Sequence, residues 1–142
     1  MQDQNFKNHA RMVPGYHYIT FLLVVLLLVG AIVNLVKSSS DNLYSSSLLV
    51  LVPIIFLLLS FYARAFSLKA QDRAIKAEEN FRHYLLTGKQ LNSELRMRQI
   101  IGLRFASDAE FPVLAEKAVS EKMSEKEIKQ SIVTWKPDYY RV

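Results

Sequence analysis

Two long runs of apolar positions dominate the pattern of hydrophobic and polar residues. Residues 18–36 carry no formal charge, and residues 48–66 carry none before Arg64. A bilayer core about 30 Å thick needs about 20 apolar residues in a helix, so each run is long enough to cross a membrane. The remaining chain is too short to cover two helices that are apolar on all sides. The pattern therefore predicts a transmembrane helical hairpin at residues 18–66.

Basic residues indicate how this hairpin is oriented. A short Ser-rich loop, residues 37–47, joins the two runs and contains one basic residue. The other flanks are richer in basic residues: Lys7, Arg11, Arg64, Lys69, Arg73 and Lys76. Because lysine and arginine collect on the cytoplasmic side, both termini are predicted to be cytoplasmic. The last four of these residues are predicted to contact lipid headgroups, each gaining about 1 kcal/mol near an anionic surface.

A cleaved signal peptide is the alternative for the first run. Lys7 and Arg11 would form its basic region, and Ser38 and Ser40 a small-x-small cleavage site. The apolar stretch is longer than the 7 to about 15 residues usual for such a peptide. We therefore favour a membrane span.

The second run is expected to continue into the cytoplasm as one long helix through residues 67–88. No glycine or proline occurs between Pro53 and Gly88, and Gly88 is a candidate C-terminal cap. Six residues of this extension share one helix face and form what we call the apolar seam: Ala70, Ala74, Ala77, Phe81, Tyr84 and Leu85. The seam is predicted to pack on the chain's own later helices, with Phe81 buried, or on a partner.

Residues 89–142 are predicted to form a small unit of three shorter helices. Their expected starts are Asn92 or Ser93, then a Ser107–Glu110 capping box, and then a Ser124–Glu127 capping box, with the third helix reaching Trp135. A unit of about 50 residues is too small to be comfortably stable alone. The predicted fold is thus all-α, with a polar N-terminal segment at residues 1–17 before the hairpin.

Candidate chemistry is sparse. The chain has no cysteine, four glycines and three histidines, and it lacks a nucleophile elbow or a glycine-rich phosphate loop. Glu79 and His83 share a helix face, but an i, i+4 pair on a charged helix is usually solvated. We therefore predict no enzymatic activity, no cofactor and no metal site.

A basic balance raises nucleic acid as an alternative partner. Residues 64–104 hold nine basic and four acidic side chains, and Arg96, Arg98 and Arg104 could contact phosphates. Since the excess lies beside the second span, lipid contact explains it as well, and we expect no nucleic acid. A transporter component is the weaker alternative because neither span has an ionisable residue near its centre.

Three segments resemble one family of uncharacterised small bacterial proteins of Bacteroidetes type with two predicted spans: residues 4–11, 104–108 and 135–142. The resemblance implies the bacterial inner membrane and brings no function or catalytic residues with it. We predict a non-enzymatic interaction protein, an accessory or scaffold subunit of a larger assembly. Its expected partners are membrane lipids and either another protein or a second copy. Three aromatic residues near the end are candidate interface residues: Trp135, Tyr139 and Tyr140.

Overall fold

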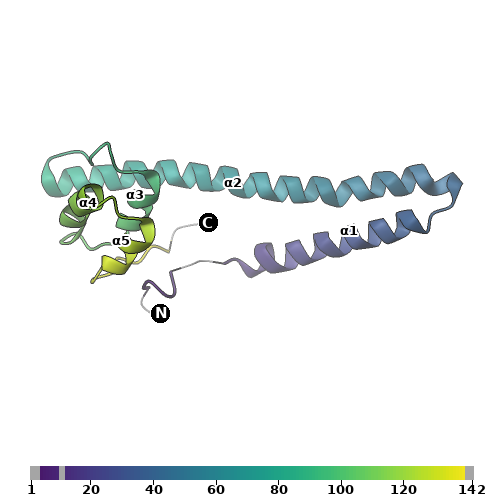
Figure 1. Ribbon diagram of the computed structural model, residues 1–142, viewed down its shortest axis with the longest axis horizontal. Helices are drawn as coiled ribbons and strands as arrows, with labels where there is room; N and C mark the ends of the chain where they lie inside the picture. Colours follow the sequence, from purple (N-terminus) through teal and green to yellow (C-terminus); the bar gives the residue numbers. More distant parts are fainter. Residues whose placement is uncertain (1–3, 10–11, 140–142) are drawn as a thin grey trace. The chain divides into compact units, whose positions relative to one another are not determined.

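The structure is a computed structural model that describes residues 4–9 and 12–139. The regular secondary structure of the described residues is entirely helical, with no strand among them. Its elements are the π-helical turn η1 (Gly15–Thr20), α1 (Phe21–Val36), the 3₁₀ turn η2 (Ser40–Asn42), α2 (Leu43–Thr87), α3 (Met97–Leu103), α4 (Phe111–Ser120) and α5 (Glu125–Ser131) (Figure 1). The all-α prediction, with two long apolar helices of which the second is much longer, is confirmed.

The chain divides into two compact units. The hairpin unit is Arg11–Ser67, and the C-terminal unit combines Met1–Ala10 with Leu68–Val142. Residues 4–9 therefore belong to the same unit as α3, α4 and α5, although the whole hairpin separates them in the sequence.

The hairpin unit contains two helices long and apolar enough to cross a membrane. Gly15–Val36 has a mean hydropathy of 2.9, and the long helical stretch Ser40–Thr87 contains a window of 2.3. Only 6% and 11% of these windows are buried, whereas a core helix of a soluble protein is mostly buried. The two helices run antiparallel within this unit (Figure 1).

Hydrogen bonds join the two helices of the hairpin unit at both ends. Near the loop, the Asn34 amide donates to Ser46 Oγ at 3.0 Å, and Ser38 Oγ lies 2.9 Å from the same oxygen. At the other end, the Tyr16 hydroxyl donates to the Ser60 carbonyl oxygen at 2.5 Å. In an apolar medium such polar contacts hold helices together, so the few polar residues of the hairpin fix its register.

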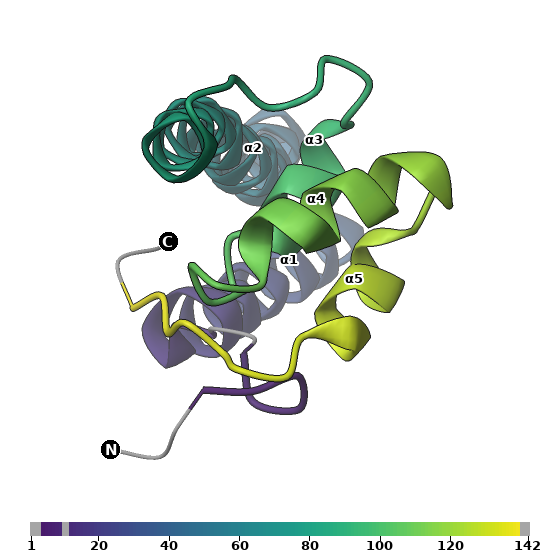
Figure 2. The ribbon, with the colours of Figure 1, turned by 90° about the vertical axis from the view of Figure 1, so that its left-hand side faces the viewer.

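The C-terminal unit has its own hydrophobic core. Leu103, Phe105, Phe111 and Ile128 are fully buried. Three of them lie on α3, α4 and α5, which are close together in this unit (Figure 2). At Gly102, an added Cβ would lie 3.2 Å from both Glu125 O and Ile128 Cγ2. This close approach of α3 and α5 explains a glycine inside a helix.

Two of the predicted helix boundaries are confirmed. Gly88 has φ +72° and its N–H donates to the Tyr84 carbonyl oxygen at 2.8 Å, so α2 ends in the left-handed cap that favours glycine. Ser124 and Glu127 form the predicted capping box. Glu127 N–H donates to Ser124 Oγ at 3.3 Å, and Ser124 N–H donates to the Glu127 carboxylate at 2.7 Å.

Other predicted boundaries are wrong. The first short helix begins at Met97 instead of Asn92 or Ser93. The Ser107–Glu110 box does not form, because the Glu110 carboxylate accepts hydrogen bonds from the N–H groups of residues 133 and 134.

The third short helix also ends earlier than predicted, at Ser131. Ile132, which follows Ser131, is already extended. Ser107 N–H donates to the Thr134 carbonyl oxygen at 3.1 Å, and Lys136 N–H donates to that of Phe105 at 2.8 Å. Trp135 therefore lies in an extended segment paired with Ala106, not in a helix.

Candidate functional site

The three segments that carry the family resemblance meet in the C-terminal unit. Gln4 exchanges two hydrogen bonds with the backbone of Asp138. Asp138 N–H donates to Gln4 Oε1 at 2.7 Å, and Gln4 Nε2 donates to Asp138 O at 3.4 Å. Residues separated by almost the entire chain are therefore in direct contact, and residues 140–142 lie outside the described part.

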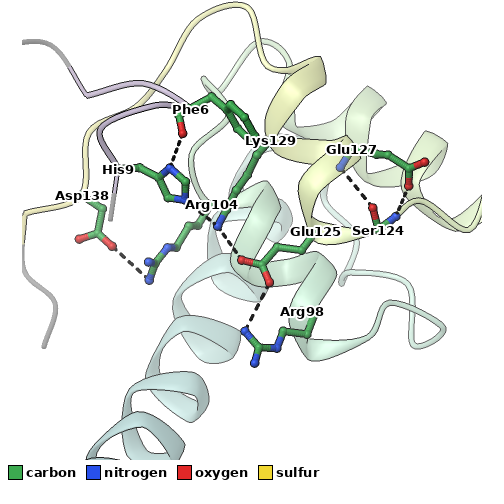
Figure 3. A network of polar contacts seen from close by, with 9 residues as sticks. All are labelled: Phe6, His9, Arg98, Arg104, Ser124, Glu125, Glu127, Lys129 and Asp138. Atoms are coloured by element: carbon green, nitrogen blue, oxygen red, sulfur yellow. Dashed lines mark hydrogen bonds and ion pairs between the residues drawn. The ribbon is translucent and has the colours of Figure 1, made fainter. Parts of the chain in front are cut away.

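His9 lies at the centre of this meeting point (Figure 3). Its Nδ1 is 2.7 Å from the Phe6 carbonyl oxygen, and its Nε2 is 3.2 Å from Lys129 Nζ. A carbonyl oxygen only accepts and an ammonium group only donates. The neutral imidazole with its proton on Nδ1 is the form that satisfies both contacts. The ring also packs against Phe105 and Trp135, each with a centroid distance of 5.8 Å.

Buried cations beside His9 are paired with carboxylates. The Lys129 ammonium lies 2.6 Å from Glu125, and Arg104 lies 3.1 Å from Asp138 (Figure 3). The side chains of Lys129 and Arg104 are only 10% and 8% exposed. Such pairs are strongly destabilising to break, because one partner is left charged in a poorly solvated place. The cluster therefore holds the N-terminal segment, α5 and the C-terminal tail together.

Arg82 makes the main polar link between α2 and the rest of this unit. Its guanidinium donates to the Ala106 carbonyl oxygen at 2.7 Å and to the Asp108 carboxylate at 2.7 Å from Nε. It also lies 3.0 Å from the Glu79 carboxylate and 4.5 Å from the centroid of the Phe111 ring. With its side chain 11% exposed, Arg82 anchors α2 to this unit, whereas the sequence predicted Phe81 as the anchor.

The two carboxylates beside Arg82 differ in their environment. Burial raises the pKa of Glu79 above its usual value, and the hydrogen bond and charge of Arg82 offset only part of this desolvation. The hydrogen bond from Arg82 lowers the pKa of Asp108, whose side chain is 62% exposed. Glu79 is thus the carboxylate that depends most on Arg82 for its charge.

The predicted packing of the apolar seam within the chain is wrong. Phe81, Tyr84 and Leu85 are 62%, 53% and 67% exposed, and the seam's three alanines are exposed as well. The face of α2 that packs on the unit instead includes Ile75, Arg82 and His83. Arg82 determines this choice because it bonds to backbone carbonyl oxygens, which the hydrophobic pattern of α2 cannot reveal. Packing of the seam on a partner stays a prediction.

A groove of about 620 Å³ lies beside the seam, within the C-terminal unit. Phe81 and Leu85 line one side, and Lys136 and Pro137 line the other. The groove borders the apolar surface of α2, but half of its lining residues are charged, Lys136 and Asp138 of the C-terminal tail among them.

The other predicted contact residues lie in different surroundings. Trp135 is half-buried against the core, and its ring lies 5.1 Å from that of Phe105 between the centroids, so it contributes to packing within the chain. Tyr139 is 47% exposed, and Tyr140 lies outside the described residues. Arg64 lines a cleft of about 350 Å³ in the hairpin unit. Three of the predicted headgroup contacts are exposed on the part of α2 that belongs to the C-terminal unit: Lys69, Arg73 and Lys76.

The remaining candidate groups take part in contacts within the chain. His83 Nδ1 lies 2.8 Å from the Lys89 carbonyl oxygen, and Glu79 binds Arg82. Within residues 4–9 and 12–139, no group of three or more histidine or acidic residues is placed to hold a metal. Arg104 is buried against Asp138, so the three arginines suggested for nucleic acid do not form one exposed face.

Gln4, His9 and Arg82 were not recognised as site residues from the sequence. Each acts through backbone carbonyls or through residues far along the chain. The sequence offered one indirect signal for two of them: Gln4 and His9 lie in residues 4–11, a segment on which the family resemblance rests.

Comparison with known proteins identifies a family for the whole chain. The model of the family of unknown function DUF6526 matches residues 1–142, and the chain belongs to this family. The resemblance to an uncharacterised family is thereby confirmed. No curated protein and no solved structure matches the chain.

Proposed function

We propose that this member of the DUF6526 family is a non-enzymatic, membrane-anchored interaction protein. It would serve as an accessory or scaffold subunit of a larger assembly in the bacterial inner membrane, with both termini in the cytoplasm. The observation that carries the proposal is the exposed apolar seam on the part of α2 outside the apolar run. Single exposed apolar residues are ordinary, but a contiguous apolar surface marks an interaction site.

The composition of this surface supports a protein partner. Phe81, Tyr84 and Leu85 offer large exposed side chains at adjoining positions, and a groove whose lining is half charged lies beside them. Aromatic residues are enriched at the centres of protein interfaces. By contrast, the charged groups around His9 and Arg82 are bonded to one another, which suits a structural role better than a catalytic one.

Membrane topology gives the first test. A reporter active only in the periplasm would be fused at Asn42, in the loop of the hairpin, and separately at Val142. We expect activity at Asn42 alone, because basic residues flank the other ends of both helices. Activity at Val142 would contradict the two-span orientation.

The interaction surface gives the second test. Leu85→Asp and Val113→Asp each place a charge at an apolar side chain that is exposed in the structure, 67% and 70% respectively. After mild detergent extraction, the size and composition of the recovered complex would be measured. We expect Leu85→Asp to reduce the complex and Val113→Asp, on α4, to leave it unchanged. Equal behaviour of the two variants would contradict a role for the seam.

A further inference from the structure

We propose that the apolar seam is a homodimer interface, in which two copies of α2 pack in parallel as a short coiled coil. This inference rests on the proposed membrane anchorage and names the partner of the seam as a second copy of the chain. It is drawn from the spacing of the seam, from the face of α2 that it occupies and from the charges that flank it.

The spacing is that of a heptad repeat. Ala70, Ala74, Ala77, Phe81 and Tyr84 follow one another in steps of four, three, four and three residues. Alternating steps of three and four keep a residue stripe facing a neighbouring helix in a left-handed coiled coil. The same steps continue toward the apolar run at Ser67 and Ala63. The alanines allow close approach of two helix backbones, and the aromatic residues supply apolar area where the helix ends.

The unit's own packing leaves this face uncovered. Ile75 and His83 are buried, and Arg82 is bound to the Ala106 carbonyl oxygen. These three positions are centred about 150° around the helix from the seam at about 100° per residue. A second helix can therefore pack on the seam without displacing any contact of the C-terminal unit.

The charged residues that flank the seam form pairs of opposite charge only when the two helices are parallel. The steps of the seam place its residues at positions a and d of the heptad, which is lettered a to g. Arg73 then occupies position g of one heptad, and Glu78 occupies position e of the next. In a parallel dimer, g faces the partner's following e position, so two symmetric Arg73–Glu78 pairs form. In an antiparallel dimer, g faces g and e faces e, which brings like charges together. Both side chains are exposed and neither makes an ion pair with another described residue.

Membrane anchorage favours the same arrangement. Two copies inserted in one bilayer with their C-terminal units on one side present their α2 extensions in parallel. Confinement to the membrane also raises the effective concentration of one seam for another. This favours association even though the alanine side chains bury little apolar area.

Disulfide cross-linking of the full chain in membranes tests the interface. The chain has no cysteine, so single cysteines can be placed without other changes. Ala77→Cys lies on the seam, and Lys76→Cys is its neighbour on another exposed face. A disulfide needs Cα atoms within about 7 Å, which the parallel seam provides at Ala77. We expect mild oxidation to give a covalent dimer with Ala77→Cys and Ala70→Cys but not with Lys76→Cys.

Charge exchange tests the register and direction. Arg73→Glu and Glu78→Arg, each added to Ala77→Cys, should reduce cross-linking because each creates like-charge pairs. The double exchange should restore cross-linking, because it reverses both charges of each pair. Failure of the double exchange to restore it would overturn the parallel register.

The outcomes separate this inference from the proposed function. Equal cross-linking of Ala77→Cys and Lys76→Cys, or none in either, would overturn the homodimer. If the variants do not cross-link but a different protein is lost from the complex with Leu85→Asp, the seam binds that protein, and the proposed function stands without the homodimer. A periplasmic C-terminus in the reporter assay would remove the basis of both.

Discussion

Replacing Arg82 by methionine should strongly destabilise the C-terminal unit, whereas replacing its neighbour Phe81 by alanine should not. Methionine keeps the length and much of the apolar volume of the arginine stem but lacks the guanidinium. The change would leave Glu79, whose side chain is 12% exposed, without its cation. It would also leave the Ala106 carbonyl oxygen without its 2.7 Å donor.

The magnitude follows from these contacts. Removing one partner of a buried ion pair costs about 3–5 kcal/mol, and the low end applies here because Glu79, whose pKa is already raised by burial, can take up a proton. The pair with Asp108 adds little, since that carboxylate is 62% exposed. We expect a loss of about 3 kcal/mol. A unit of about 85 residues is stable by roughly 4–13 kcal/mol, so a large part of its stability would be lost.

Limited proteolysis in membranes measures this loss. When opening is fast relative to cleavage, the cleavage rate of residues 89–139 follows the open population, and about 3 kcal/mol raises that population by about a hundredfold. Phe81→Ala should change the rate little, because the ring is 62% exposed. This expectation reverses the sequence-based one, in which a buried Phe81 anchored the unit.

A double variant tests the physical cause. Adding Glu79→Gln to Arg82→Met removes the stranded carboxylate, so the double variant should be more protease-resistant than Arg82→Met alone. The reasoning would be refuted if Phe81→Ala increased cleavage more than Arg82→Met. It would also be refuted if Glu79→Gln gave no rescue, since the cost would then have another origin.

Three further changes test other parts of the C-terminal unit. Ser124→Ala removes the α5 cap that accepts from Glu127 N–H and should lower stability by about 1 kcal/mol, as measured by thermal unfolding. In the Asp108→Asn variant, the free energy of unfolding should decrease less at acidic pH than it does in the unchanged protein. Arg82 lowers the pKa of this carboxyl in the folded state, so its contribution is complete above the ordinary value of 3.8 and is lost as pH falls through the folded value. His9→Ala should increase hydrogen exchange in residues 4–9 while leaving that of α4 unchanged; equal protection in both proteins would contradict its central role.

Local signals allowed much of the fold to be predicted. The two apolar runs specify helices by length and composition, and Gly88 ends α2 through its own backbone conformation. The Ser124 cap depends on residues three positions apart. Each of these features is determined by neighbours in the sequence, which explains why a pattern could find it.

The parts that were missed depend on distant backbone groups. Glu110 has the spacing of a capping residue but bonds instead to the N–H groups of residues 133 and 134. Arg82 resembles a solvated charge on a helix until the carbonyl oxygen of Ala106 is placed beside it. A hydrophobic pattern takes no account of hydrogen bonds to distant backbone groups. It therefore predicted the seam as the inner face of α2, whereas the inner face contains the buried Arg82.

Under the proposed membrane anchorage, the contact between Gln4 and Asp138 constrains how the chain can insert. The C-terminal unit is built from chain that precedes the hairpin and chain that follows it, so its two parts can meet only if they are on the same side of the bilayer. An odd number of crossings separates them, and an even number brings them together. A molecule in which one apolar run failed to insert could therefore not complete this unit, and its exposed remnants would be open to proteolysis. Under the proposed anchorage, the unit can therefore close only when the N-terminal and C-terminal parts of the chain are on the same side of the membrane.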